Sequence, residues 1–365
     1  MNRTIGLVTA NFAIGGFGTI ADERPTVAIP FGGRYRLIDF ALSNIVNARV
    51  QTVGLITPYR YRSIIDHIGA GKEWDLDRKD GGLYILPGTI YGFRENEGHF
   101  LFRDFLQNKR YFQSSGDYIL ACSGALVCNI DYQPMIARHE YSGRGVTLLY
   151  RKTEPDFRRN GYYLSFDESG RVSEIKRSDH GEYLFLDSFI INKALLQRLM
   201  KEYGNLGQLD LMDVLALITA EVPMEGYYFD GYIASMDGLA NYLRSSLELM
   251  DRSVRRELFN PERKIITKIH DTPPALYTAD SHVRSALVAA GSTVEGRVEN
   301  SIVFRSVRIE KGAVVRNCVI MDKCIIKAGA YLEDVICDRS VTVSPGNRIQ
   351  GSPESPVVLP KGGVV

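Results

Sequence analysis

The C-terminal part of the chain repeats with a period of seventeen residues. Apolar residues recur there at intervals of five, six and six: Val298, Val303, Ile309, Val315, Ile320, Ile326, Leu332, Cys337, Val343 and Ile349. Three short sides per turn, each with one buried residue, are typical of a hexapeptide-type parallel β-helix. Gly-Ala pairs at 312–313 and 329–330 fit its corners. A β-sandwich with accidental spacing is the alternative, and the unbroken run of matches argues against it.

The N-terminal part alternates short apolar segments with helical patterns. Strands are expected at 5–10, 52–57, 118–122 and 145–150, and helices at 35–47, 59–69, 101–113 and 132–141. This alternation predicts an α/β fold with a doubly wound, mostly parallel, Rossmann-like sheet. Such sheets bind ligands beyond the carboxyl ends of their strands, so chemistry is expected just after residues 10, 57 and 122.

Domain boundaries are suggested by a polar connector with two proline-containing turns, Asn260-Pro261 and Pro273-Pro274. We therefore expect an α/β domain at 1–255, a linker at 256–280 and the β-helix at 281–365. A chain of 365 residues with 45% hydrophobic residues has ample material for two cores.

Composition excludes several classes of partner. The net charge of +1 gives no global field toward nucleic acid, and the basic, aromatic cluster at 59–62 is followed closely by Asp66 and Glu73. No apolar run is long enough to span a membrane. The N-terminus has no signal-peptide pattern, the five cysteines form no Cys-x-x-Cys pair and the six histidines lack metal-ligand spacing. We expect a cytoplasmic protein.

Residues 30–44 read PFGGRYRLIDFALSN, a glycine turn that leads into an apolar helical pattern. Arg34 and Arg36 beside Gly32 and Gly33 could hold an anion with guanidinium and N–H groups. The alternative is a loop that simply enters a core helix, and the residues alone leave both readings open.

This run is similar to the signature PFGGKYRIIDFALSN of bacterial ADP-glucose pyrophosphorylases (glucose-1-phosphate adenylyltransferases). The resemblance continues more loosely through residues 53–57 to 85–87 and covers most of the chain. It implies a nucleotidyltransferase-like α/β domain followed by a left-handed parallel β-helix. The active enzymes of that family transfer an adenylyl group from ATP to glucose 1-phosphate with the help of Mg²⁺.

The catalytic positions of that family are changed in this chain. The family's glycine-rich loop, LAGGxGTRL, aligns with residues 9–17, which places Gly16 at the catalytic arginine. A rival register through residues 15–19 imitates the glycines but leaves Ile20 at the arginine. The lysine that precedes the family signature is Thr26 here.

The metal and sugar-phosphate positions are changed as well. Ala125 stands at the metal-binding aspartate, Ser178 at the sugar-phosphate lysine and Asp187 at a glycine of the sugar-contacting strand. Tyr232 aligns with the second metal aspartate, in a less secure register with Asp230 two residues away.

The resemblance therefore assigns no catalytic, cofactor-binding or metal residue to this chain, and Mg²⁺ and ATP belong to a catalytic partner. It points to the non-catalytic, regulatory GlgD-type branch, whose subunits join a catalytic paralogue in a hetero-oligomer, expected to be a tetramer. A homo-oligomer is compatible with the chain alone. In that branch the subunit modulates the conversion of ATP and glucose 1-phosphate to ADP-glucose and diphosphate in glycogen biosynthesis.

One binding site is carried over from the family. Arg24 and Arg36 match two arginines of its effector site between the domains, whereas Glu23 stands at the nearby activator lysine. Two other functions stay open. The chain could be an active sugar-phosphate nucleotidyltransferase with relocated metal ligands at Asp230 or Asp237, or a free-standing sugar-phosphate sensor.

Overall fold

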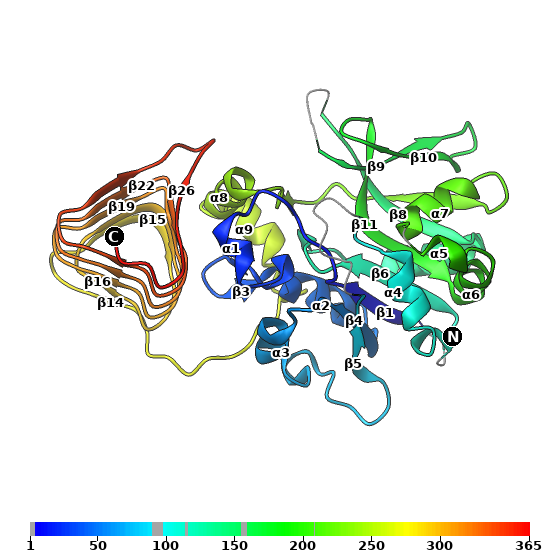
Figure 1. The fold of residues 1–365 in the computed structure, drawn as a ribbon, viewed down its shortest axis with the longest axis horizontal. Helices are drawn as coiled ribbons and strands as arrows, with labels where there is room; N and C mark the ends of the chain where they lie inside the picture. The colour runs from blue at the N-terminus through cyan, green and yellow to red at the C-terminus, as the bar shows by residue number, and fades with distance from the viewer. Residues whose placement is uncertain (1–3, 90–97, 114–115, 155–158, 208) are drawn as a thin grey trace.

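The computed structural model describes residues 4–89, 98–113, 116–154, 159–207 and 209–365. It has two parts, an α/β layer structure around one large sheet and a stack of short parallel strands wound as a three-sided prism (Figure 1). The chain begins at the far end of the α/β part and ends in the prism.

All four predicted strands are present in the large sheet, and three of them lie side by side in its parallel half. The parallel neighbours are β6 (Tyr118–Ser123), β1 (Thr4–Thr9), β4 (Thr52–Thr57) and β5 (Gly82–Pro87). β4 is buried throughout and β1 and β6 nearly so, because helices cover both faces of the sheet. Their carboxyl ends meet at one edge, as the prediction requires.

The other half of the sheet is more antiparallel than the sequence indicates. β8 (Val146–Lys152) runs antiparallel to β11 (Tyr183–Asn192), and β11 is also antiparallel to β6. The remaining strands are β9 (Gly161–Phe166), β10 (Val172–Ser178) and β12 (Met224–Tyr228), the last of which is parallel to β8. The hairpin of β9 and β10 projects from the body (Figure 1). β10 buries only every third residue or so and exposes the rest, as in a sheet with one wet face.

The predicted helices are present but two are shorter than expected. The helices are α1 (Thr19–Asp22), α2 (Leu37–Asn47), α3 (Arg62–Ile68), α4 (Phe102–Gln107), α5 (Gln133–Ser142), α6 (Lys193–Glu202), α7 (Leu211–Leu217), α8 (Leu239–Glu248) and α9 (Arg252–Leu258). α4 stops at Gln107 because the Asn108 side chain donates to the carbonyl of Asp104 at 2.8 Å, which satisfies a helix-end acceptor. A 3₁₀ turn then covers Tyr111–Gln113.

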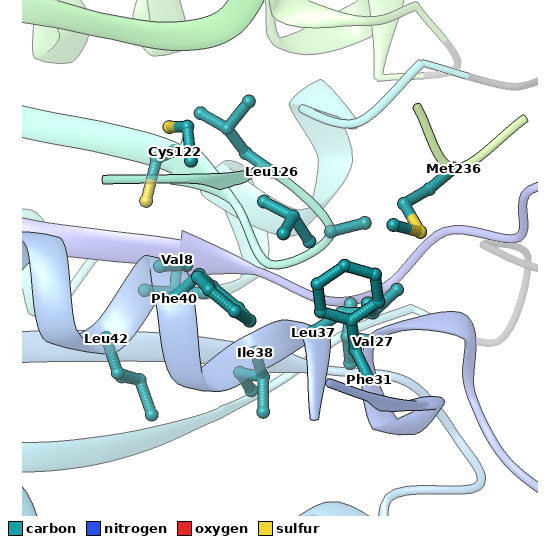
Figure 2. Close-up of a cluster of buried hydrophobic side chains, with 14 of the residues drawn as sticks. Val8, Val27, Phe31, Leu37, Ile38, Phe40, Leu42, Cys122, Leu126 and Met236 are labelled. Carbon is teal, nitrogen blue, oxygen red and sulfur yellow. The ribbon is translucent and has the colours of Figure 1, made fainter. Parts of the chain in front are cut away.

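α2, which carries the signature run, is the central helix of the core. Nine consecutive residues from Leu37 to Ile45 are buried. The Asp39 side chain accepts from the backbone N–H of Arg36 at 2.9 Å and so caps the helix. Figure 2 shows the apolar side chains of this helix beside those of Val8, Leu126 and Met236. These segments are far apart in the sequence but belong to one buried cluster. The residues of the signature run therefore have a structural role in the core of the α/β part.

The C-terminal part is a parallel β-helix with the predicted period. Its strands are β14 (Leu276–Tyr277), β15 (His282–Val288), β16 (Thr293–Val294), β17 (Arg297–Val303), β18 (Arg308–Ile309), β19 (Val314–Arg316), β20 (Val319–Ile320), β21 (Ile325–Ile326), β22 (Tyr331–Glu333), β23 (Val335–Cys337), β24 (Thr342–Val343), β25 (Arg348–Gln350) and β26 (Val357–Leu359). Val298 pairs with Val315, which pairs with Leu332, at steps of seventeen residues. All the predicted inward positions are buried except Ile349, which is half-buried.

The corners of the β-helix repeat with the same period. Left-handed backbone recurs at three places in each coil: Asn300, Asn317 and Asp334; Ser306, Lys323 and Ser340; Gly312, Gly329 and Gly346. The glycines suit the left-handed region because they have no Cβ, and Asn, Asp and Ser tolerate it better than branched residues do. Short minor strands β2 (Pro30–Phe31), β3 (Tyr35–Arg36), β7 (Val127–Cys128) and β13 (Ile233–Ala234) complete the fold.

One side of the β-helix packs against the α/β part, with α8 and α1 at the junction (Figure 1). Ile302, Phe304, Val319, Met321 and Ile336 belong to the same buried cluster as the residues of α2. The connector between α9 and β14 is hydrogen-bonded to the α/β part, for example through the N–H of Ile266, which donates to Ser43 Oγ at 2.8 Å. The two parts therefore share one buried cluster at their junction, in addition to the separate core inside the β-helix, and the connector is held against the α/β part.

Candidate functional site

A cavity of about 480 Å³ lies at the carboxyl ends of the central strands, where ligands bind in folds of this class. Its walls come from the loop after β1 (13–16), residues 98–99, residues 159–162 with the neighbouring part of β11, Arg177 of β10, and the start of α8 with the residue Asp237 before it. Of the three places where chemistry is expected, the loop after β1 lines this cavity, and Ser123 and Ala125 line a small neighbouring pocket.

The loop after β1 is filled by its own side chains. Asn11 and Phe12 are both buried. Asn11 Nδ2 donates to Asp104 Oδ2 at 2.7 Å, and the Phe12 ring stacks on His99 with ring centres 4.1 Å apart. A phosphate-binding loop needs open backbone N–H groups that face the ligand. Here side chains occupy that space.

The position of the missing arginine is closed by backbone. Gly16 has φ +80°, and a Cβ added there would lie 3.2 Å from Gly238 Cα. The N–H of Leu239 donates to the carbonyl of Gly16 at 3.0 Å. At the lysine position, Thr26 is buried and its Oγ1 accepts from the N–H of Ile14 at 3.3 Å. Both residues therefore fasten the loop.

The metal positions do not fit Mg²⁺. Ala125 is buried and offers no oxygen from its side chain. The Tyr232 hydroxyl donates to Glu248 Oε2 at 2.7 Å, Asp230 is exposed, and Asp237 contacts Arg159. Within the described ranges no group of three or more His, Cys, Asp or Glu side chains could hold a metal ion. Since Mg²⁺ prefers carboxylate oxygens, the residues at the two family metal positions, Ala125 and Tyr232, cannot hold it, and the carboxylate of Asp237 is paired with Arg159.

An ion-pair network occupies the cavity instead. Arg159 Nη2 lies 3.3 Å from Asp187 Oδ2, Arg159 Nε lies 3.4 Å from Asp237 Oδ2, and His99 Nδ1 lies 3.2 Å from Asp187 Oδ2. Burial would raise the pKa of Asp187, but His99 and Arg159 together hold it below its ordinary value. Sequence reasoning missed Arg159 and His99, since no spacing or motif marks them.

A second cavity, of about 240 Å³, lies between the two parts of the chain. The described residues line it with six cationic side chains and two carboxylates: Arg24, Arg34, Arg36, Arg305, Arg339 and Lys361, with Glu23 and Asp322. The structure thus brings Arg24 and Arg36, the two predicted effector residues, to one cavity. The excess of positive charge favours an anion there.

The two predicted arginines are held differently. Arg24 Nη2 donates to both carboxylate oxygens of Asp338, at 2.8 and 2.9 Å. Arg36 Nη1 donates to the carbonyl of Ser63 at 2.5 Å. Burial is the main cause that lowers the pKa of Arg36, opposed by Asp39 and assisted by Arg24. Arg24 is therefore neutralised by a carboxylate, whereas Arg36 is mainly affected by its burial.

The β-helix supplies half of the cationic groups, and sequence reasoning missed them. Arg305, Asp322 and Arg339 are seventeen residues apart and stand one above another in successive coils. The same period that revealed the β-helix could have found them. Lys361 follows the last strand and forms an ion pair with Glu23. A lysine thus reaches the place where Glu23 replaces the family's activator lysine.

Two further expectations from composition concern the cysteines and the membrane. The five cysteines all lie in described segments and are buried and unpaired. Among the residues that the structure describes, no helix has the length and apolar character needed to cross a membrane.

Comparison with known proteins agrees with both halves of the fold. Residues 15–222 match the family model "Nucleotidyl transferase", and residues 273–355 match that of the GlmU-like C-terminal hexapeptide. The chain is 37% identical over 364 residues to the glycogen biosynthesis protein GlgD of Geobacillus stearothermophilus, covering 100% of this chain and 97% of that protein. It is 33% identical over 362 residues to the protein of the same name from Bacillus subtilis, covering 99% and 96%.

A catalytic relative is also similar. The glucose-1-phosphate adenylyltransferase of Thermotoga neapolitana is 31% identical over 330 residues, covering 86% of this chain and 77% of that protein. The resemblance seen in residues 30–44 is therefore confirmed over the length of the chain. The chain belongs to the glucose-1-phosphate adenylyltransferase family of nucleotidyl transferases, in the group of the GlgD glycogen biosynthesis proteins.

Proposed function

We propose that this chain is a regulatory, catalytically inactive subunit of glucose-1-phosphate adenylyltransferase in bacterial glycogen biosynthesis. It modulates the conversion of ATP and glucose 1-phosphate to ADP-glucose and diphosphate, which a catalytic paralogue performs. The observation that carries the proposal is Ala125, a buried methyl group at the sheet edge where the family's reaction needs a metal-binding carboxylate.

The chemistry explains why the loss matters. Nucleotidyl transfer depends on positioning and on stabilising negative charge around the phosphates, with little covalent work for the protein. Loss of one charge-stabilising group typically costs about 10²–10³ in rate. Here Gly16, Thr26 and Ala125 replace three such groups, and Phe12 fills the loop between them.

We assign effector binding to the cavity between the two parts, with Arg24 and Arg36 among its cationic groups. Arginine forks bind phosphate oxygens in pairs, which suits a phosphorylated small molecule. Because Arg36 belongs to the α/β part and Arg305 and Arg339 belong to the β-helix, a ligand held by all three would tie the parts together. A change in their relative placement is then the signal passed to the partner.

The proposed partner is a catalytic paralogue in a cytoplasmic hetero-oligomer, expected to be a tetramer. Support comes from large apolar side chains that are exposed on the connector, Ile269 at 76%, and on β14, Leu276 at 60% and Tyr277 at 49%. Exposed apolar side chains on neighbouring residues such as Leu276 and Tyr277 favour a protein interface.

The test is an activity assay with and without the partner. The chain alone should form no ADP-glucose from ATP, glucose 1-phosphate and Mg²⁺. Added to its catalytic paralogue, it should change the rate or the effector response. The Ala125→Asp variant should also stay inactive, because Gly16 and Thr26 are unchanged. Robust Mg²⁺-dependent activity of the unmodified chain would overturn the proposal.

A free-standing sugar-phosphate sensor is a second candidate, favoured by the cationic cavity, which needs no partner to be complete. Co-purification of this chain with an adenylyltransferase from cell extract would count against it. An active enzyme that uses Asp230 or Asp237 has less support, because Asp237 faces Arg159 and Asp230 is exposed. In such an enzyme, changing these aspartates to alanine would abolish activity.

A further inference from the structure

The cavity at the carboxyl ends of the central strands contains a cationic side chain, that of Arg159. The guanidinium of Arg159 lies between Asp187 at 3.3 Å and Asp237 at 3.4 Å. The side chains of Arg159 and Asp187 are only 18% and 17% exposed, and that of Asp237 is 34% exposed. Screening by water is therefore weak around the Arg159–Asp187 pair.

The backbone at Asp187 departs from the regular conformation of a strand. Asp187 has φ +49°, in the left-handed region, where the register of β11 shifts between Phe185 and Phe189. Residues with a Cβ adopt this conformation less readily than glycine does, although Asp is among those that tolerate it best. The side chain of Asp187 contacts Arg159 and His99, and His99 is itself fixed by the stacked ring of Phe12.

Asp237 belongs to the opposite wall of the cavity. It directly precedes Gly238 and α8, and its Oδ2 accepts from Ser235 Oγ at 3.0 Å. Leu239, the next residue but one, donates to the loop after β1 through Gly16. Arg159 thus bridges β11 on one side and the start of α8 on the other.

Two ionised carboxylates that face one point repel each other, and a cation between them, either a divalent metal ion or an organic cation, relieves that repulsion. We infer that Arg159 takes the place of a divalent metal ion in this cavity and ties β11 to the start of α8, so that the cavity is charge-balanced without metal. The inference concerns the cavity alone and holds whether or not the chain regulates a partner.

The first experiment uses the unmodified full-length chain. Binding of Mn²⁺ is followed by electron paramagnetic resonance, and the melting temperature is compared in millimolar Mg²⁺ and in EDTA. No Mn²⁺ should bind at millimolar concentration, and the two melting temperatures should agree. Metal binding that raises the melting temperature of this chain would overturn the inference.

The second experiment removes the internal cation. Arg159→Met keeps much of the side-chain volume but leaves Asp187 and Asp237 facing each other. Its melting temperature should fall by roughly 5–10 °C, the effect expected for breaking a buried ion pair in a chain of this size. Mg²⁺ or Mn²⁺ at ten times its dissociation constant should then raise it by about 3 °C. A folded variant that gains nothing from either metal would overturn the inference.

Two further variants test whether the metal response depends on Arg159 and on Asp187 specifically. Arg177→Met removes another cation that lines the same cavity, and it should show no metal-dependent gain. Arg159→Met combined with Asp187→Gly removes one of the facing carboxylates and relieves the left-handed strain. This double variant should regain most of the lost melting temperature and no longer respond to metal. A metal response that persists without Asp187 would contradict its role, and this readout stands even when the single variant does not fold.

Discussion

The guanidinium of Arg24 donates two hydrogen bonds to the carboxylate of Asp338, at 2.8 and 2.9 Å, and so joins the α/β part to the β-helix. The Asp338 side chain is 2% exposed and that of Arg24 is 11% exposed. The pair therefore lies within the junction of the two parts, at the edge of the cationic cavity. The contribution of this pair to the free energy of unfolding can be measured, because removal of one partner leaves the other buried and charged.

Arg24→Met should lower the free energy of unfolding by about 3–5 kcal/mol, because Asp338 is left as a buried, unpaired carboxylate. Urea unfolding followed by the fluorescence of Trp74, the single tryptophan, measures this. Asp338→Asn added to Arg24→Met should recover part of the loss. Arg62→Met is the control, since Arg62 and Asp66 are 94% and 70% exposed and should contribute under about 1 kcal/mol. Equal losses in both variants would refute the special role of the junction pair.

Arg339→Gln should weaken the binding of a polyanion to the cationic cavity by about tenfold or more, the worth of one charge-assisted hydrogen bond. Calorimetric titration with inorganic pyrophosphate measures this, at low and at raised salt. Arg110→Gln removes an exposed arginine outside the cavity and should leave the affinity unchanged. If both variants bind alike, the cavity is not where the anion binds.

Ile326→Ala should destabilise the chain by about 2–5 kcal/mol, because Ile326 points into the β-helix and is fully buried. Its neighbour Ile325 points outward and is half-buried, so Ile325→Ala should cost distinctly less. The two melting curves compare residues of the same type, one position apart on β21. A larger loss at Ile325 would mean that the inward and outward faces have been exchanged.

Asp210 should make stability fall as the pH rises through weakly acidic values. Burial raises the pKa of Asp210 to about 6 from 3.8, so the folded chain holds a proton that the unfolded chain has released. The stabilising contribution is complete below about pH 4 and is lost as the pH rises through about 6, a change of about 3 kcal/mol. Asp210→Asn should abolish this dependence, although it also loses one acceptor for the N–H groups of Phe100 and Met212 at every pH. Urea titrations of both proteins across this range should show the wild-type advantage shrinking. A difference that stays constant with pH would contradict the assignment.

The sequence predicts the β-helix well because its signal is long and local. Each coil repeats the same spacing, and the buried positions from Val298 to Val343 follow it directly. The strands 52–57 and 118–122 are predicted for a related reason, since a strand buried on both faces is apolar throughout. The antiparallel course of β11 is not visible in this way, because the direction of a strand depends on connections and not on its own residues.

The residues of the candidate site also differ in whether the sequence alone could identify them. The replacement of the family's metal-binding aspartate by Ala125 follows from alignment alone, and so do Arg24 and Arg36. Arg159 and Asp187 could not be paired from the sequence, because they are brought together by a strained turn of backbone within β11. The pairing of Arg24 with Asp338 was equally hidden, since the two lie on different parts of the chain and 314 residues apart.

Because the corners of the β-helix recur every seventeen residues, one coil corresponds to seventeen codons of the gene. Ser306, Lys323 and Ser340 occupy the same left-handed corner in successive coils, directly after Arg305, Asp322 and Arg339. Duplication or deletion of seventeen codons would preserve every strand register, yet it would add or remove one charged side chain from the wall of the cationic cavity. A change in coil number is therefore a route by which the charge of that cavity can evolve while the fold stays intact.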